Sequence, residues 1–196
     1  MITITSPDTF KRIPWKNGLG FTTELAINDG ANLDNFDWRL SIATVTNDGE
    51  FSNFSGYERN LVLIEGNGIE LTHDAKTKDT LTQLLDFANF DGGSKTMGSL
   101  PNGDIKDFNI ITKKSTTNVQ VNTYVKSNQF TIKQPTSGLL FGYSLSSDID
   151  IDFNSSQTQP VKVTQGSLAK LNLADLNDVE LTLTGANMIV VQITAK

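Results

Sequence analysis

Alternation of apolar and polar residues is the feature that most limits what this chain can fold into. Apolar side chains recur at every second position in several short segments, as in Trp38–Ile42, Val119–Val121, Ile149–Phe153 and Glu180–Thr184. A period of two places successive side chains on opposite faces of a strand, whereas a helix needs apolar residues three and four positions apart. The pattern therefore predicts β-strands through most of the chain.

Turn residues separate these segments at short intervals. Asp-Gly and Asn-Gly pairs suit the positive φ angles of tight hairpins. Such pairs include Asp29-Gly30, Asp48-Gly49, Asn67-Gly68, Asp91-Gly92 and Asn102-Gly103. Helix is weakly indicated, because the best candidate, Asp79 to Phe87, is short and rich in Thr, which has little helical preference. We expect an antiparallel, hairpin-rich, all-β protein.

A strand, a glycine turn and a second strand recur in both halves of the sequence. Leu63–Leu71 is loosely echoed by Val163–Leu171, and no linker rich in Pro, Gly or Ser lies between the halves. This recurring pattern of strand, glycine turn and strand is typical of jelly-roll barrels, the architecture that includes cupins. We therefore expect two similar β-units in contact, residues 1–115 and residues 116–196, within one compact chain.

Charge and composition exclude several classes of function. The 196 residues carry a formal net charge of -6, which disfavours nucleic acid and anionic membranes as partners. The chain has no cysteine, which excludes disulfides, thiolate metal sites and cysteine nucleophiles. No apolar run approaches the roughly 20 residues of a spanning helix, and no signal peptide is recognisable. We expect a soluble, cytoplasmic protein.

Histidine content argues against a metal centre of the kind that many cupins contain. Several ligands must converge on a metal ion, and this chain has one histidine, His73. We interpret His73, which precedes Asp74, as a surface residue that caps a turn. No Gly-x-Ser-x-Gly nucleophile elbow is present. Gly18-Leu19-Gly20 lacks both the Gly-Lys-Ser/Thr ending of a phosphate loop and the third glycine of a dinucleotide-binding turn. No metal, cofactor or catalytic residue is assigned, although a metal site made only of oxygen ligands stays open.

Arginine usage is more informative than total charge. Only Arg12, Arg39 and Arg59 are arginines among 16 basic side chains. A planar guanidinium grips carboxylates and amides in a way that lysine cannot reproduce. Alternation places Arg39 with Ser41 on one strand face, Thr22 with Glu24 on another, and Asp107 with Asn109 on a third. These polar sets either point outward into solvent or line a cavity.

The motifs together resemble the HutD/Ves family of cupin-like proteins. The resemblance covers Trp15 to about Lys114, in order, while the second half shows only general β-patterning. The matching residues are Trp15-Lys16-Asn17-Gly18-x-Gly20, Thr22-x-Glu24, Trp38-Arg39-x-Ser41-x-Ala43, Asp48-Gly49-x-Phe51-Ser52-x-Phe54-x-Gly56, Arg59, Phe87-Ala88-Asn89-Phe90-Asp91-Gly92 and Asp107-Phe108-Asn109. Relatives often carry Thr-Arg-Glu at Thr22-Thr23-Glu24 and Arg-Arg at Lys113-Lys114, so the ligand of this chain is expected to differ accordingly.

The resemblance implies a bicupin, meaning two cupin-like jelly-roll barrels in one chain, with a small-molecule pocket in the first and a homodimer left open. It also implies a link to histidine utilisation or stress response. A buried Arg39 would require an anionic partner, for which Glu24 and Asp107 are the candidates. The candidate ligand-binding residues are Lys16, Asn17, Thr22, Glu24, Arg39, Ser41, Arg59, Asp107 and Asn109.

Alternative roles stay open for several of these residues. Lys16 and Asn17 either lie at the pocket rim or form a hairpin turn chosen for its backbone geometry. Arg59 either faces ligand or braces the aromatic segment before it. Trp15 and Trp38 are interpreted as core aromatics, with an apolar pocket wall as the alternative.

Three functions are compatible with this sequence. We favour a non-catalytic binder of a small polar metabolite, carboxylated or amide-bearing, with a regulatory or accessory role. The alternative is a metal-independent isomerase or lyase in which Glu24 or Asp107 transfers a proton and Lys16 or Arg39 stabilises negative charge. A structural or partner-binding β-protein, the third reading, predicts that Arg39 is exposed to solvent.

Overall fold

The computed structural model describes residues 2–15, 21–133, 137–154, 159–176 and 180–196. The chain divides into two compact units, an N-terminal unit, Phe10–Thr117, and a C-terminal unit, which combines Met1–Thr9 with Asn118–Lys196. The two candidate residues Lys16 and Asn17 lie outside the described residues.

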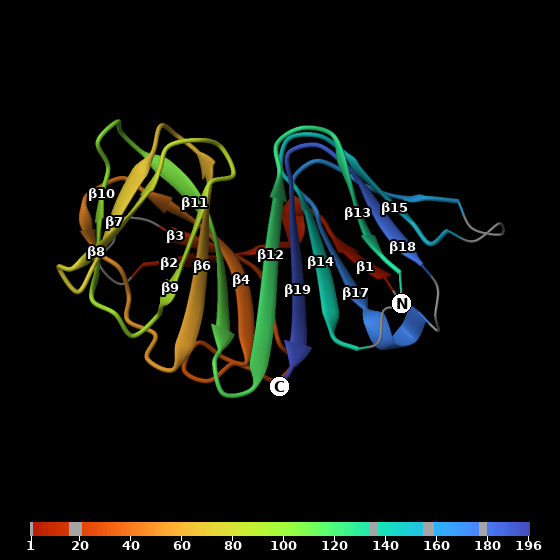
Figure 1. Ribbon diagram of the computed structural model, residues 1–196, viewed down its shortest axis with the longest axis horizontal. Helices are drawn as coiled ribbons and strands as arrows, with labels where there is room; N and C mark the ends of the chain where they lie inside the picture. Colours follow the sequence, from red (N-terminus) through yellow and green to blue (C-terminus); the bar gives the residue numbers. More distant parts are fainter. Residues whose placement is uncertain (1, 16–20, 134–136, 155–158, 177–179) are drawn as a thin grey trace. The chain divides into compact units, whose positions relative to one another are not determined.

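The N-terminal unit consists of two antiparallel sheets (Figure 1). The larger sheet has the strand order β2 (Lys11–Pro14), β3 (Phe21–Ile27), β4 (Trp38–Val45), β11 (Ile105–Lys113), β6 (Tyr57–Glu65) and β9 (Phe87–Asp91). The smaller sheet has the order β5 (Gly49–Glu50), β10 (Thr96–Ser99), β7 (Ile69–His73) and β8 (Thr77–Leu81). Buried residues of both sheets, such as Leu61, Leu63 and Leu71, form one apolar cluster.

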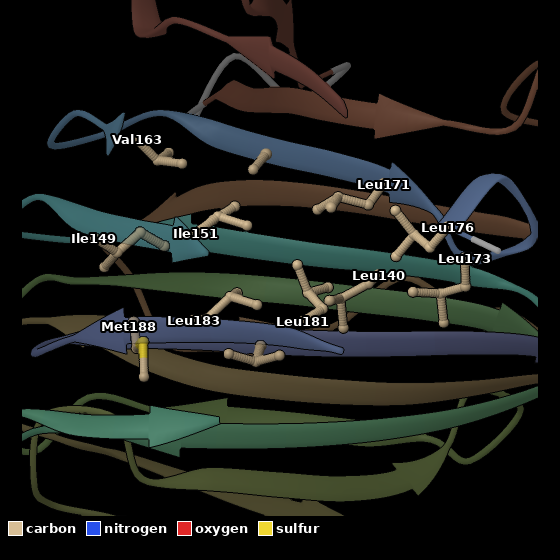
Figure 2. Close-up of a cluster of buried hydrophobic side chains, with 12 residues drawn as sticks. Leu140, Ile149, Ile151, Val163, Leu171, Leu173, Leu176, Leu181, Leu183 and Met188 are labelled. Atoms are coloured by element: carbon tan, nitrogen blue, oxygen red, sulfur yellow. The ribbon is translucent and has the colours of Figure 1, made fainter. Parts of the chain in front are cut away.

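The C-terminal unit also contains two sheets. The first has the order β1 (Ile2–Thr5), β17 (Leu168–Asn172), β14 (Leu139–Ser144), β19 (Met188–Ala195) and β12 (Thr117–Tyr124). The second has the order β13 (Asn128–Ile132), β18 (Leu181–Gly185), β15 (Ile149–Asp152) and β16 (Val161–Val163). Figure 2 shows the core of this unit, where apolar side chains such as Leu140, Ile151 and Leu183 point toward one another. The described part of this core is apolar, so it offers no polar site comparable to the one below.

Glycine turns carry the chain between sheets in both units. Gly66 follows β6 and Gly166 follows β16, and the next strand in each case belongs to the other sheet. Their φ angles of 98° and 79° lie in the region that favours glycine. The loose similarity between Leu63–Leu71 and Val163–Leu171 therefore reflects a glycine turn that leads from one sheet to the other in each unit.

The expected all-β class is confirmed, and three details differ from expectation. Among the described residues, the strands form two open sheets in each unit and not a closed barrel. The first residues were assigned to the N-terminal unit, but β1 pairs with β17, with Ile2 opposite Leu171. The candidate helix Asp79 to Phe87 is instead the end of β8, a turn and the start of β9.

His73 is a buried residue, so its interpretation as a surface turn cap was wrong. It ends β7 on the same face as Ile69 and Leu71 and is only 5% exposed. Its Nδ1 lies 2.9 Å from Oγ1 of Thr96, and its Nε2 lies 3.0 Å from Oδ2 of Asp79.

Across residues 2–15, 21–133, 137–154, 159–176 and 180–196, no helix is long and apolar enough to cross a membrane.

Candidate functional site: an arginine-lined cavity

Strand register brings the polar residues of the N-terminal unit together. Ile111 of β11 lies opposite Arg39 of β4 on one side and opposite Arg59 of β6 on the other. Two residues earlier, Asn109 lies opposite Ser41 on β4. Because side chains alternate along a strand, the residues at 107, 109 and 111 share one face. The two arginines are thus next-nearest neighbours across three strands.

This face forms part of a cavity of about 690 Å³. Five of the nine candidate ligand-binding residues line it. They are Arg39, Ser41, Arg59, Asp107 and Asn109. The volume falls within the roughly 300 to 1,000 Å³ typical of small-molecule sites. A second, mostly polar hollow of about 340 Å³ lies near Asn28 and Lys113, away from these residues.

Arg39 is paired with a carboxylate. Its Nε donates a hydrogen bond of 2.8 Å to Oε2 of Glu24, and the two side chains are 7% and 13% exposed. The partner arrives from β3, where the register shifts between Glu24 and Ala26. Of the two carboxylates expected to balance Arg39, Glu24 is therefore the one that contacts it. A purely structural or partner-binding protein required Arg39 to be exposed to solvent, and that expectation was wrong.

Arg59 is bound by neutral oxygens and aromatic rings. Its Nη1 donates to the carbonyl oxygen of Ser52 at 3.2 Å, and its Nη2 donates to Oδ1 of Asn109 at 2.8 Å. Three phenylalanine rings surround the guanidinium, with Cζ 5.3 Å from the centroid of Phe51, 5.6 Å from Phe54 and 5.3 Å from Phe90. Arg59 thus braces the aromatic segment and also lines the cavity.

The charge of Arg59 has no carboxylate partner within ion-pair distance in the described chain. The side chain is 5% exposed, and its Nε has no hydrogen-bond partner among the described residues. Burial lowers the pKa of Arg59 to about 10, with the charge of Arg39 acting in the same direction and that of Asp107 opposing it. A buried cation held mainly by neutral groups favours the approach of an anion.

Asp107 is fully buried at the base of the same face. Its Oδ1 accepts a hydrogen bond from Nδ2 of Asn109, while Oδ2 has no partner among the described residues. Burial raises the pKa of Asp107 to about 7, against the smaller lowering effects of Arg59, Asn109 and the backbone of Ala43. The amide of Asn109 therefore lies between a guanidinium and a carboxyl group that titrates near neutral pH.

Trp15 forms part of the cavity wall, and Thr22 holds its indole without lining the cavity itself. Nε1 of Trp15 donates a hydrogen bond of 2.9 Å to Oγ1 of Thr22, and Trp15 lines the cavity. Thr22 therefore positions the indole. Trp15 packs against the apolar cluster of this unit and also lines the cavity, so the core and pocket-wall interpretations both describe its location. Trp38 does not line the cavity and is buried.

Sequence reasoning did not assign the aromatic cage around Arg59. Phe51 and Phe54 were quoted as part of a motif without a role, and Phe90 lies on another strand. The spacing Phe51-x-x-Phe54 shortly before a rare arginine was the available signal. The described residues contain no group of three or more His, Cys, Asp or Glu side chains placed to bind a metal ion.

Comparison with known proteins agrees with this fold. The two antiparallel sheets of each unit define a cupin-like β protein. It is similar to a cupin 2 conserved barrel domain protein from Leptotrichia buccalis, with a TM-score of 0.55 at 14% identity over 94% of this chain and 92% of that one. The HutD family profile matches residues 7–190, and the chain belongs to the HutD family.

Two curated relatives match part of the chain. A protein of Pseudomonas putida named for the hutC 3′ region is 43% identical over 102 residues, which are 52% of this chain and 53% of that protein. Protein Ves of Escherichia fergusonii is 36% identical over 128 residues, 65% of each chain. The matches thus span about half to two thirds of the length of these relatives.

Solved structures match over the whole length. HutD from Pseudomonas fluorescens SBW25 has a TM-score of 0.80 at 24% identity and covers 100% of both chains. A conserved protein of unknown function from Pseudomonas aeruginosa PAO1 has a TM-score of 0.81 at 27% identity over 98% of each chain. The fold described above is therefore shared with both of these solved structures.

Proposed function

We propose that the N-terminal unit is a receptor for a small anionic metabolite whose carboxylate lies between Arg39 and Arg59. The observation that carries this proposal is the buried guanidinium of Arg59, which lines the cavity without a carboxylate at ion-pair distance in the described chain. Arg39 is already neutralised by Glu24. One positive charge is therefore available to one ligand carboxylate.

The shape of the site supports binding as the main activity. Aromatic rings from Phe51 and Phe54 and the indole of Trp15 supply apolar surface next to the two guanidinium groups. Small-molecule sites commonly combine an apolar lining with a few polar groups that set orientation. The ligand class is thus a compact acid with an apolar or planar body.

The names of relatives suggest a setting for this receptor. The relative from Pseudomonas putida is named for the hutC 3′ region. We extend this to a regulatory or accessory role in amino-acid utilisation, with each unit a cupin-like jelly roll and the chain a bicupin. Acids from histidine breakdown are accordingly the first ligands to test.

Isothermal titration calorimetry tests the proposal with formate, urocanate, N-formylglutamate and N-formiminoglutamate. We expect at least one acid to bind and its methyl ester to bind much more weakly, because esterification removes the charge. Arg59→Met should lower the affinity roughly 10- to 100-fold, the cost of a lost charge-assisted hydrogen bond. The matched control is Arg12→Met, because Arg12 is an exposed arginine that stacks on Phe21 outside the cavity lining.

Two results would overturn the proposal. One is the absence of binding by every acid in the panel. The other is equal affinity in Arg59→Met and Arg12→Met, which would place the binding site elsewhere.

A metal-independent enzyme is the second candidate, favoured by the near-neutral titration of Asp107. A pKa of about 7 suits a group that both takes and returns a proton at physiological pH. Glu24 suits that role less well because it is paired with Arg39. If the chain is an enzyme, Asp107→Asn abolishes turnover of a bound acid and leaves binding intact, as assayed by product formation against calorimetry.

A further inference from the structure

Asp107 presents one paired and one unpaired oxygen in the anion site. Nη2 of Arg59 can only donate, so it fixes Oδ1 of Asn109 as the acceptor. The amide Nδ2 of Asn109 must then face Oδ1 of Asp107, to which it donates. A proton on Asp107 is therefore directed to Oδ2, the oxygen that has no partner among the described residues.

The charge balance of the cavity depends on that proton. With Asp107 ionised, its charge and that of Glu24 balance the two arginines, and the group is neutral. With Asp107 protonated, the group carries one positive charge, which a single carboxylate balances. A carboxylic acid kept neutral by burial can also donate a hydrogen bond to an anion.

We propose that the cavity binds its anionic ligand together with one proton, which resides on Oδ2 of Asp107. This inference rests on the proposed function and deepens it. The protonation of Asp107 sets the net charge of the cavity and thereby the charge of the ligand that the cavity binds. The ligand carboxylate would accept hydrogen bonds from an arginine and from the protonated carboxyl group. The step is a simple association in which one anion and one proton enter and nothing leaves.

In the described part of the chain, the other charged groups near Asp107 are two arginines and three carboxylates. The cations on neighbouring strands are Arg39 of β4 and Arg59 of β6, and Glu24 of β3 faces Arg39. Asp48 and Glu50 also line the cavity, but both are exposed. Asp48 accepts hydrogen bonds from Leu100 and Ser99, and Glu50 lies 3.7 Å from Nζ of Lys95. Among the described lining residues, Asp107 is the buried carboxyl group.

Burial raises the pKa of Asp107 to about 7 before any ligand enters, and an anion beside it raises the pKa further. Linkage then requires that affinity be nearly constant below pH 6 and fall with increasing pH above 7. The ligand should bind roughly tenfold more weakly at pH 8 than at pH 6. Close to one proton should be taken up per ligand bound at pH 8.

The experiment is calorimetry with formate and N-formylglutamate, whose carboxyl groups stay ionised from pH 6 to pH 8. Titrations in buffers of different ionisation enthalpy give the number of protons taken up. Asp107→Asn imitates the protonated carboxyl group, so we expect its affinity to vary by less than about twofold between pH 6 and pH 8, with no proton uptake. Its affinity at pH 8 should exceed that of the wild type.

The outcomes separate this inference from the proposed function. Binding that is independent of pH in the wild type, or equal proton uptake in Asp107→Asn, overturns the proton-coupled mechanism and leaves the anion receptor intact. Failure of every acid to bind overturns both. A direct readout on the unliganded wild type is the ¹³C carboxyl resonance of Asp107, which should titrate near pH 7, and titration near pH 4 would also overturn the inference.

Discussion

Two buried ionic arrangements in the N-terminal unit differ in how their charges are satisfied. Arg39 and Glu24 are bonded directly, with 2.8 Å between Nε and Oε2. Arg59 and Asp107 are instead separated by the amide of Asn109, which bonds to both. The first arrangement is a stable ion pair, while the second leaves a cation and a titratable acid available to a ligand.

The pair of Arg39 and Glu24 should be strongly coupled. Removing one partner of a buried ion pair costs roughly 3 to 5 kcal/mol, because the other charge stays buried without compensation. We expect Arg39→Met to destabilise the protein by about that amount and the double variant Arg39→Met with Glu24→Gln to recover much of it. Urea unfolding of the wild type, the two single variants and the double variant measures the coupling. Losses of unfolding free energy that simply add in the double variant would contradict it.

The pH dependence of stability reports on Asp107 without any ligand. Its folded pKa of about 7 lies above the ordinary aspartate value of 3.8, so the unfolded state loses the proton first as pH rises. Its stabilising contribution is therefore complete below pH 4 and is lost between pH 4 and pH 7, by up to roughly 4 kcal/mol. Asp107→Asn removes this titration.

Urea denaturation of wild type and Asp107→Asn across pH 4 to 9 checks this expectation. The stability of the wild type relative to the variant should fall between pH 4 and pH 7 and then level off. A relative stability that rises with pH over the same range would show that Asp107 is ionised and stabilised in the folded protein.

At the scale of strands, the register of β4, β11 and β6 determines the site. Because Ile111 is opposite both Arg39 and Arg59, a shift of one residue in either pairing would turn an arginine to the other face of the sheet. Period-two patterning predicted which residues share a face within each strand. It could not predict which strands are neighbours, because that depends on contacts between residues far apart in sequence.

Sequence patterns also explain what was missed at this scale. The repeat Ile69-x-Leu71-x-His73 places the histidine on the buried face of β7, and Thr96 is its register partner on β10. The lone histidine was judged by its neighbour Asp74 and not by this alternation. The cage around Arg59 was missed because Phe90 comes from β9, the strand beside β6.

The turn after β6 should be sensitive to any side chain. A Cβ on Gly66 would lie 2.5 Å from the carbonyl oxygen of Asp104, and its φ is already 98°. We expect Gly66→Ala to cost more than 2 kcal/mol, from backbone strain plus a clash with main-chain atoms. Gly103 has a φ of 90° but nothing within 4 Å of an added Cβ, so Gly103→Ala is the control for strain alone. Thermal unfolding measures both variants. Equal losses of stability in Gly66→Ala and Gly103→Ala would show that the clash contributes nothing.

At the scale of the whole chain, the two units differ in what they contain. The N-terminal unit carries the arginine-lined cavity, and the described core of the C-terminal unit is apolar. Two similar β-units were foreseeable from the recurring strand and turn pattern. The placement of the first strand was not, since its pairing with β17 joins residues more than 160 positions apart.

Pairing of β1 gives a test of how the chain is divided. Ile2 packs against the apolar core of the C-terminal unit, whereas Ile4 is 40% exposed. Ile2→Ser should accelerate amide hydrogen exchange in β17 by reducing apolar burial, while Ile4→Ser has a smaller effect. Faster exchange in β4 and β11 instead would show that the first residues stabilise the N-terminal unit.

A crystal structure of the wild type soaked with N-formylglutamate or formate tests the central claim most directly. We expect density for a carboxylate in the cavity, with an oxygen at about 3 Å from the guanidinium of Arg59 and next to Asp107. Clear density for the acid at another surface, with no acid bound beside Arg59, would contradict it.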